Sequence, residues 1–180
     1  MTRFVALLRG INVGTAKAVA MSELRACFEA LGFQNVHTVL RSGNVVFDST
    51  GPVDNAALET AIARDTGVSA AVVVIDGARF REIVAQNPLA RVAVDPSRAL
   101  VHFLDRVPDD TSSGRPTDEE LLPEQLAVGP HAIYQWCPDG ISKSKVPAKY
   151  FTGLGTAATG RNLRTVEKLI ALLDEPLPLG

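Results

Sequence analysis

The chain has few cysteines, and this shortage limits the chemistry it can carry. Only two occur among its 180 residues, Cys27 and Cys137. Neither has a cysteine or histidine neighbour at the spacing of a zinc site, which argues against zinc. We expect two buried free thiols in a reducing cytoplasm, and the sequence leaves a single disulfide as the alternative.

Long apolar runs and an excess of basic charge are also lacking. No run approaches the roughly 18 residues of a membrane span. The first run, residues 4–8, ends at Arg9 and is too short for the core of a signal peptide. The formal net charge of −2 argues against general binding to duplex DNA, which favours a basic domain. We therefore expect a cytoplasmic protein without membrane contact, metal or cofactor.

The composition that remains is that of a folded protein. Apolar residues make up 46% of the chain and charged residues 21%, which excludes disorder for the bulk of it. The length allows one ordinary domain or two small ones.

The first part of the chain alternates strand and helix patterns. Short apolar runs predict strands, and apolar residues at intervals of three and four predict helices. Asp54 is placed to cap one helix, and Gly32 and Gly67 are placed to end the two helices. The predicted order is a strand at 4–8, a helix at 21–31, strands at 36–40 and 45–47, a helix at 55–66 and a strand at 71–75. This order predicts a ferredoxin-like split βαβ unit over residues 1–76.

The same order repeats after a connecting helix and linker at 77–97. The predicted elements are a strand at 99–104, a helix at 117–122, strands at 126–128 and 132–137, a helix at 144–151 with Pro147 in its first turn, a weak strand at 156–160 and a final helix capped by Asn162. We therefore expect an α+β fold of two ferredoxin-like (βαββαβ) units in tandem. Residues 98–180 form the second unit, which includes the C-terminal helix.

No catalytic motif is recognisable, so catalytic residues are unknown. The segment 10–17 places its glycines and lysine at the wrong spacing for a nucleotide-binding P-loop. His37, His102 and His131 share no motif spacing, and Ser42 lacks the Gly-x-Ser-x-Gly pattern of hydrolases.

Charge is segregated along the chain. Residues 105–124 hold seven acidic residues against two basic ones, which indicates a solvated loop because no metal-site spacing appears. Residues 138–170 hold six basic residues against two acidic ones. This basic segment is either a solvated surface or a site for an anion.

Two groups of residues are candidates for anion binding. In the first unit, the split βαβ order brings the loop after residue 8 and the hairpin at 42–43 to the same end of the sheet. Arg9, Asn12, Ser42 and Asn44 are therefore expected to lie close together. The alternative is that Asn12 and Asn44 only satisfy backbone groups of their loops.

The second candidate group lies at two predicted helix N-termini, which attract anions. Lys143 and Lys145 flank the start of the helix expected at Ser144, and Arg161, Asn162 and Arg164 flank the start of the last helix. The alternative is that Arg161 pairs with the acidic segment 105–124 and stabilises the fold.

Several strings resemble a known family. They are LRGINVG at 8–14, RSGNVVF at 41–47, the pair Asn87-Pro88, SKSK at 142–145 and TGRNLRTVEKL at 159–169. Together they resemble the bacterial family called domain of unknown function 1697. The chain departs from the family pattern at Thr15, Gly160 and Leu163, where the family favours Gly, Ala and Trp. The resemblance implies a pair of ferredoxin-like units and no established activity.

Three functions are compatible with these features. The first is a binding protein for a phosphorylated small molecule or a nucleotide. The second is a single-stranded RNA-binding module, which would need aromatic residues on an open sheet face. Phe4 and Phe47 are the aromatic residues of the first unit's strands, and Tyr134 and Trp136 share a strand face in the second, where burial is the alternative. The third is an enzyme without a recognisable motif.

Overall fold

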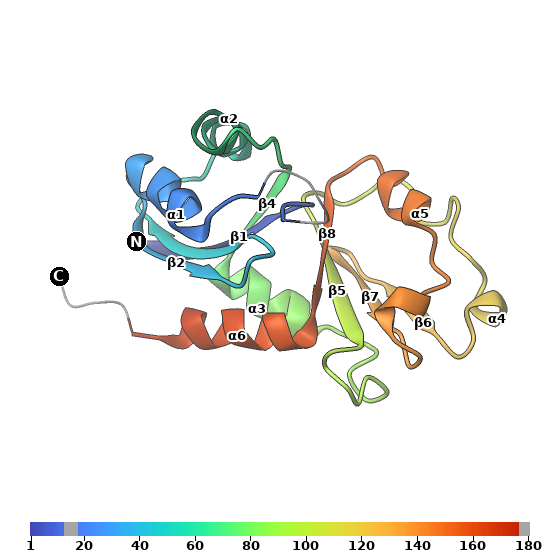
Figure 1. The fold of residues 1–180 in the computed structure, drawn as a ribbon. Helices are drawn as coiled ribbons and strands as arrows, with labels where there is room; N and C mark the ends of the chain where they lie inside the picture. The colour runs from blue at the N-terminus through green and yellow to red at the C-terminus, as the bar shows by residue number, and fades with distance from the viewer. Residues whose placement is uncertain (13–17, 177–180) are drawn as a thin grey trace. The chain divides into compact units, whose positions relative to one another are not determined.

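The computed structural model describes residues 1–12 and 18–176, so the end of the 8–14 string lies outside the described residues. The chain has an α+β fold with two four-stranded antiparallel sheets (Figure 1). It divides into two compact units, Met1–Arg81 with the described residues from Glu167 onward, and Glu82–Val166. No helix in the described part of the chain is both long and apolar enough to cross a membrane.

The first sheet has the strand order β2-β3-β1-β4. Its strands are β1 (Thr2–Leu8), β2 (Gln34–Val39), β3 (Asn44–Ser49) and β4 (Val72–Asp76). The third strand pairs with both the first and the second, all antiparallel. The predicted position of the third strand is therefore confirmed.

Two helices cover one face of the first sheet. These are α1 (Met21–Ala30) and α2 (Asn55–Thr66), whose residues Phe28 and Ile62 join Ala6 and Phe47 of the sheet in one apolar core. The predicted helix ends are confirmed, because the Asp54 side chain accepts hydrogen bonds from the first backbone N–H groups of α2, and Gly67 follows that helix with φ of 67°.

The second sheet repeats this order as β6-β7-β5-β8. Its strands are β5 (Ala99–Leu104), β6 (Gln125–Val128), β7 (Ala132–Trp136) and β8 (Ala158–Asn162). The short helix α4 (Asp118–Leu121) connects β5 to β6, and its N-terminus carries the capping box of Thr117 and Glu120.

The helix predicted at 144–151 begins later than expected. A 3-10 turn η1 occupies Ile141–Lys143, and α5 is only Ala148–Thr152, with Pro147 as its N-cap. The prediction that a helix starts at Ser144 is wrong because a residue before proline avoids the helical region, which keeps Val146 extended. Lys143 and Lys145 therefore do not lie at a helix N-terminus.

Two further helices, α3 (Gly77–Ala85) and α6 (Leu163–Asp174), follow β4 and β8. The sequence assigned the whole last helix to the second unit, whereas the structure groups its residues from Glu167 onward with the first. Two sets of contacts explain this grouping. Arg3 of β1 donates to the carbonyls of Leu172 and Glu175 at 3.0 and 2.7 Å, and Arg81 pairs with Asp174 at 2.7 Å.

Gly43 occupies a position where no side chain fits. Its φ is 79°, and a Cβ atom there would lie 2.7 Å from Cδ1 of Ile11. We expect Gly43→Ala to lower the free energy of unfolding by about 2 kcal/mol, through backbone strain and overpacking. The control Gly32→Ala has the same strain, with φ of 87°, but meets nothing within 4 Å, so about 1 kcal/mol is expected. Equal losses in urea denaturation would contradict the overpacking.

Candidate functional site

The loops at one end of the first sheet are held together by direct hydrogen bonds. The Leu8 N–H donates to the Gly43 carbonyl at 2.8 Å, and the Asn12 side-chain Nδ2 donates to the Arg41 carbonyl at 2.7 Å. The expected proximity of the loop after β1 and the β2–β3 hairpin is therefore confirmed.

The two asparagines at this end are engaged with the backbone. The Asn12 Oδ1 accepts from Val19 N–H at 2.7 Å, in addition to the bond from its amide to Arg41. Buried Asn44 donates to the Val39 carbonyl at 2.7 Å and to Ser42 Oγ at 3.0 Å. Both amides therefore have the structural role that the sequence left as the alternative.

Two arginines at this end are exposed to solvent. Arg9 directly follows β1, and Arg41 lies in the β2–β3 hairpin. Neither guanidinium forms an ion pair within residues 1–12 and 18–176. Arg41 was missed from the sequence, although the strand register gives the signal, because pairing of Leu7 with Asn44 brings Arg9 and Arg41 to the same end.

The backbone at this end is unusually bent. Gly10, Asn12 and Leu40 have φ values of 70°, 55° and 58°. Leu40 is a branched residue in the left-handed region, a conformation that costs energy and is common at functional sites. The bend turns the chain sharply beside both arginines.

Of the second candidate group, Lys145 is used inside the fold. Its Nζ donates to the carbonyls of Leu122 and Glu120 at 2.6 and 3.3 Å, and its backbone N–H donates to Glu124 at 2.7 Å. These bonds fasten the segment after η1 to the end of α4. Lys143 is exposed on η1.

The remaining members of that group lie around the start of α6. Arg161 is buried, 9% exposed, and burial lowers its pKa to about 10. Its Nη1 donates to the Gly160 carbonyl at 2.8 Å. Asn162 Oδ1 accepts from Thr165 N–H at 3.0 Å, which confirms it as the helix cap, and Arg164 is exposed. Arg161 and Arg164 therefore differ in their access to solvent.

A buried polar network in the second unit was not anticipated from the sequence. The Glu124 carboxylate, 5% exposed, accepts from Gln135 Nε2 at 2.6 Å and from Ser144 Oγ at 2.7 Å. Gln135 Oε1 in turn lies 2.7 Å from His102 Nε2. These residues are far apart in the sequence, so only the folded sheet reveals the network. It explains the 142–145 string in part, since Ser144 anchors that segment.

Titration in and around this network does not favour nucleophilic catalysis. Burial and then the nearby Glu124 raise the pKa of Cys137 to about 12. Burial and a hydrogen bond with Asp65 raise the pKa of Cys27 to about 11. The prediction of two buried free thiols is confirmed, and both stay protonated at neutral pH, whereas a reactive cysteine needs a lowered pKa.

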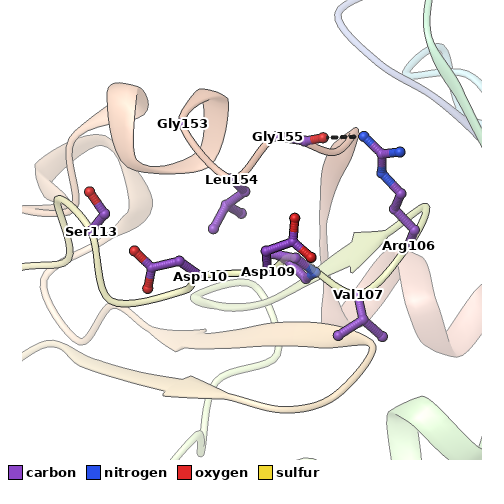
Figure 2. A pocket seen from close by; sticks show the side chains of 9 residues that line it. Arg106, Val107, Asp109, Asp110, Ser113, Gly153, Leu154 and Gly155 are labelled. Carbon is purple, nitrogen blue, oxygen red and sulfur yellow. Dashed lines mark hydrogen bonds between the residues drawn. The ribbon is translucent and has the colours of Figure 1, made fainter.

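The largest described pocket of the second unit is acidic. It has a volume of about 460 Å³ and lies between the loop after β5 and the turn at 153–155 (Figure 2). Asp109 and Asp110 line it, and Arg106 donates from Nη2 to the Gly155 carbonyl at its rim, at 2.6 Å. In the described ranges, no three histidine, cysteine or acidic side chains are grouped so that they could hold a metal ion.

The aromatic residues considered for RNA binding are in the two cores. Phe47 packs edge-on against Phe28 of α1, with ring centroids 5.1 Å apart, and Phe4 stacks on Phe47. Tyr134 and Trp136 are 2% and 8% exposed, and the Tyr134 hydroxyl donates to the Ile83 carbonyl. None of the four is available on an open sheet face, so the alternative of burial holds.

Comparisons with known proteins agree with the resemblance in the sequence. One solved structure, described as that of the conserved bacterial protein SP0830 from Streptococcus pneumoniae, is similar with a TM-score of 0.70 and 27% identity. The match covers 96% of this chain and 99% of that one. No curated protein matches. The family described as protein of unknown function (DUF1697) matches residues 1–134, and the chain belongs to this family.

Proposed function

We propose that the protein binds a phosphate-bearing small molecule at the loop end of the first sheet. Arg9 and Arg41 are the binding residues of this proposed phosphate site. The observation that carries the proposal is that the hydrogen bonds of Leu8 and Asn12 to the β2–β3 hairpin bring two exposed guanidinium groups to one end of one sheet. A guanidinium can grip phosphate through two parallel hydrogen bonds.

The local charge supports this site over the second candidate group. Residues 8–12, 18–20, 39–44 and 69–72, which make up this end, contain no acidic residue. Two like charges repel each other, and a bound anion relieves that repulsion. Lys145, by contrast, is held by carbonyl groups. Lys143, Arg161, Asn162 and Arg164 stay a prediction of a second anion site.

The test is titration of the protein with inorganic phosphate by calorimetry at low salt. We expect binding to weaken at least about tenfold in Arg9→Gln and in Arg41→Gln, because a hydrogen bond to a charged group contributes about 1.5–3 kcal/mol. Arg64→Gln on α2, where Arg64 pairs with Asp65 at 2.6 Å, is the matched control and should bind like the wild type. Absence of phosphate binding, or equal affinity in all variants, would refute the proposal.

We also propose that both units are ferredoxin-like and that the protein is cytoplasmic. In each sheet the local strand order is 2-3-1-4, with helices between the first and second strands and between the third and fourth. This is the arrangement of the split βαβ fold.

A further inference from the structure

A groove adjoins the Arg9 side of the proposed phosphate site. It has a volume of about 400 Å³ and is lined by Glu59, Thr60 and Ala63 of α2 and by residues 69–71 before β4. The carbonyl of Ala71, in this lining, accepts the Arg9 backbone N–H at 2.9 Å. A ligand held by Arg9 can therefore extend along the groove.

The polar groups of the groove are arranged to accept hydrogen bonds. Glu59 Oε1 accepts from Val72 N–H at 2.8 Å, which holds the carboxylate in place. Thr60 Oγ1 donates its proton to the Ala56 carbonyl at 2.8 Å, so the hydroxyl oxygen is left as an acceptor. Ser69 adds a further exposed hydroxyl. A complementary ligand segment carries several hydroxyl donors and no negative charge beside Glu59.

The apolar part of the groove is too small for a nucleobase. Its lining has three alanines, Ala63, Ala70 and Ala71, and no aromatic side chain. Binding of a base commonly depends on stacking against an aromatic ring. The groove therefore favours a sugar or polyol over a base.

From this combination, and resting on the proposed function, we propose that the ligand is a sugar phosphate. Its phosphate binds Arg9 and Arg41, and its hydroxyl groups bind Glu59, Thr60 and Ser69 in the groove. The inference selects sugar phosphates over free phosphate, and it gives the base of a nucleotide no contact.

The test compares inorganic phosphate, ribose 5-phosphate and adenosine monophosphate by calorimetry. We expect ribose 5-phosphate to bind about tenfold tighter than phosphate, which corresponds to one or two additional hydrogen bonds, and adenosine monophosphate to bind no tighter than ribose 5-phosphate. In the double variant Thr60→Val with Ser69→Ala, the advantage of ribose 5-phosphate should fall to about twofold while phosphate affinity is unchanged. The control pair Ser22→Ala with Thr50→Val changes exposed hydroxyls elsewhere in the unit.

The outcomes separate this inference from the proposed function. If phosphate binding depends on both arginines but ribose 5-phosphate has no advantage, or keeps its advantage in the groove variant, the phosphate site stands and the sugar site is wrong. Tighter binding of adenosine monophosphate would also overturn the choice of ligand. If neither phosphate nor ribose 5-phosphate binds, both proposals fail.

Discussion

Asp48→Ala is expected to lower the free energy of unfolding by about 3–5 kcal/mol, the usual cost of removing one partner of a buried ion pair. The Asp48 side chain is fully buried on β3, and Arg3 donates to its two oxygens at 2.9 and 3.3 Å. Asn35 donates to the same carboxylate at 2.8 Å. The variant leaves the largely buried guanidinium and this amide without their acceptor.

The pKa of Asp48 shows which interaction dominates. Burial by itself raises this pKa, but hydrogen bonds from Arg3 and Asn35 outweigh burial and hold it below the ordinary value of 3.8. The carboxylate therefore stabilises the fold above that ordinary value, and its contribution is lost as the pH falls through the lower folded-state pKa. Because Arg3 also binds the carbonyls of Leu172 and Glu175, the loss extends to the end of α6.

Urea denaturation at pH 7 measures the effect. Glu29→Ala, which removes the exposed pair of Arg25 and Glu29 on α1, is the control and should cost less than about 1 kcal/mol. A loss for Asp48→Ala no larger than that of the control would show that the buried pair does not stabilise the fold.

Acidification from pH 7 to pH 4 is expected to cost the wild type about 3 kcal/mol through His102 alone. Burial lowers the pKa of His102 from 6.5 to about 4, against a smaller opposing effect of its hydrogen bond to Gln135. The ring is also stacked on Phe151, with centroids 4.1 Å apart. Between these two pKa values the unfolded chain binds the proton and the folded chain does not, so stability falls as the pH falls.

The variant His102→Gln isolates this effect. Glutamine can still donate to Gln135 but does not titrate, so the part of the pH dependence between pH 6.5 and 4 should be largely lost. His131→Gln, at a loop position, should keep the wild-type profile. An unchanged profile in His102→Gln, measured by urea denaturation at a series of pH values, would mean that His102 is not the group responsible. Asp48 does not interfere, because its contribution changes below its ordinary pKa of 3.8.

Local features of the sequence predicted most of the secondary structure. The cap residues Asp54 and Asn162 mark helix starts because their side chains bond to backbone N–H groups only two or three residues away. Alternating apolar runs and the hairpin at 41–44 predicted the strands and the position of the third strand. Pro147 shows the limit of such local reasoning, since its effect on the residue before it moved the helix start from Ser144 to Ala148.

Composition and pattern alone therefore determined the α+β class, the order of the elements, the helix caps and the two buried thiols. The tertiary structure decided which polar side chains meet. His102 and Gln135 are 33 residues apart and Glu124 and Ser144 are 20 apart, and no local pattern relates them. The pairing of Arg9 with Arg41 and the loss of Lys145 as a free charge depend likewise on strand register and on which carbonyls lie within reach. Hydrogen bonding and burial act through space, so the chemistry of these residues follows from the folded chain.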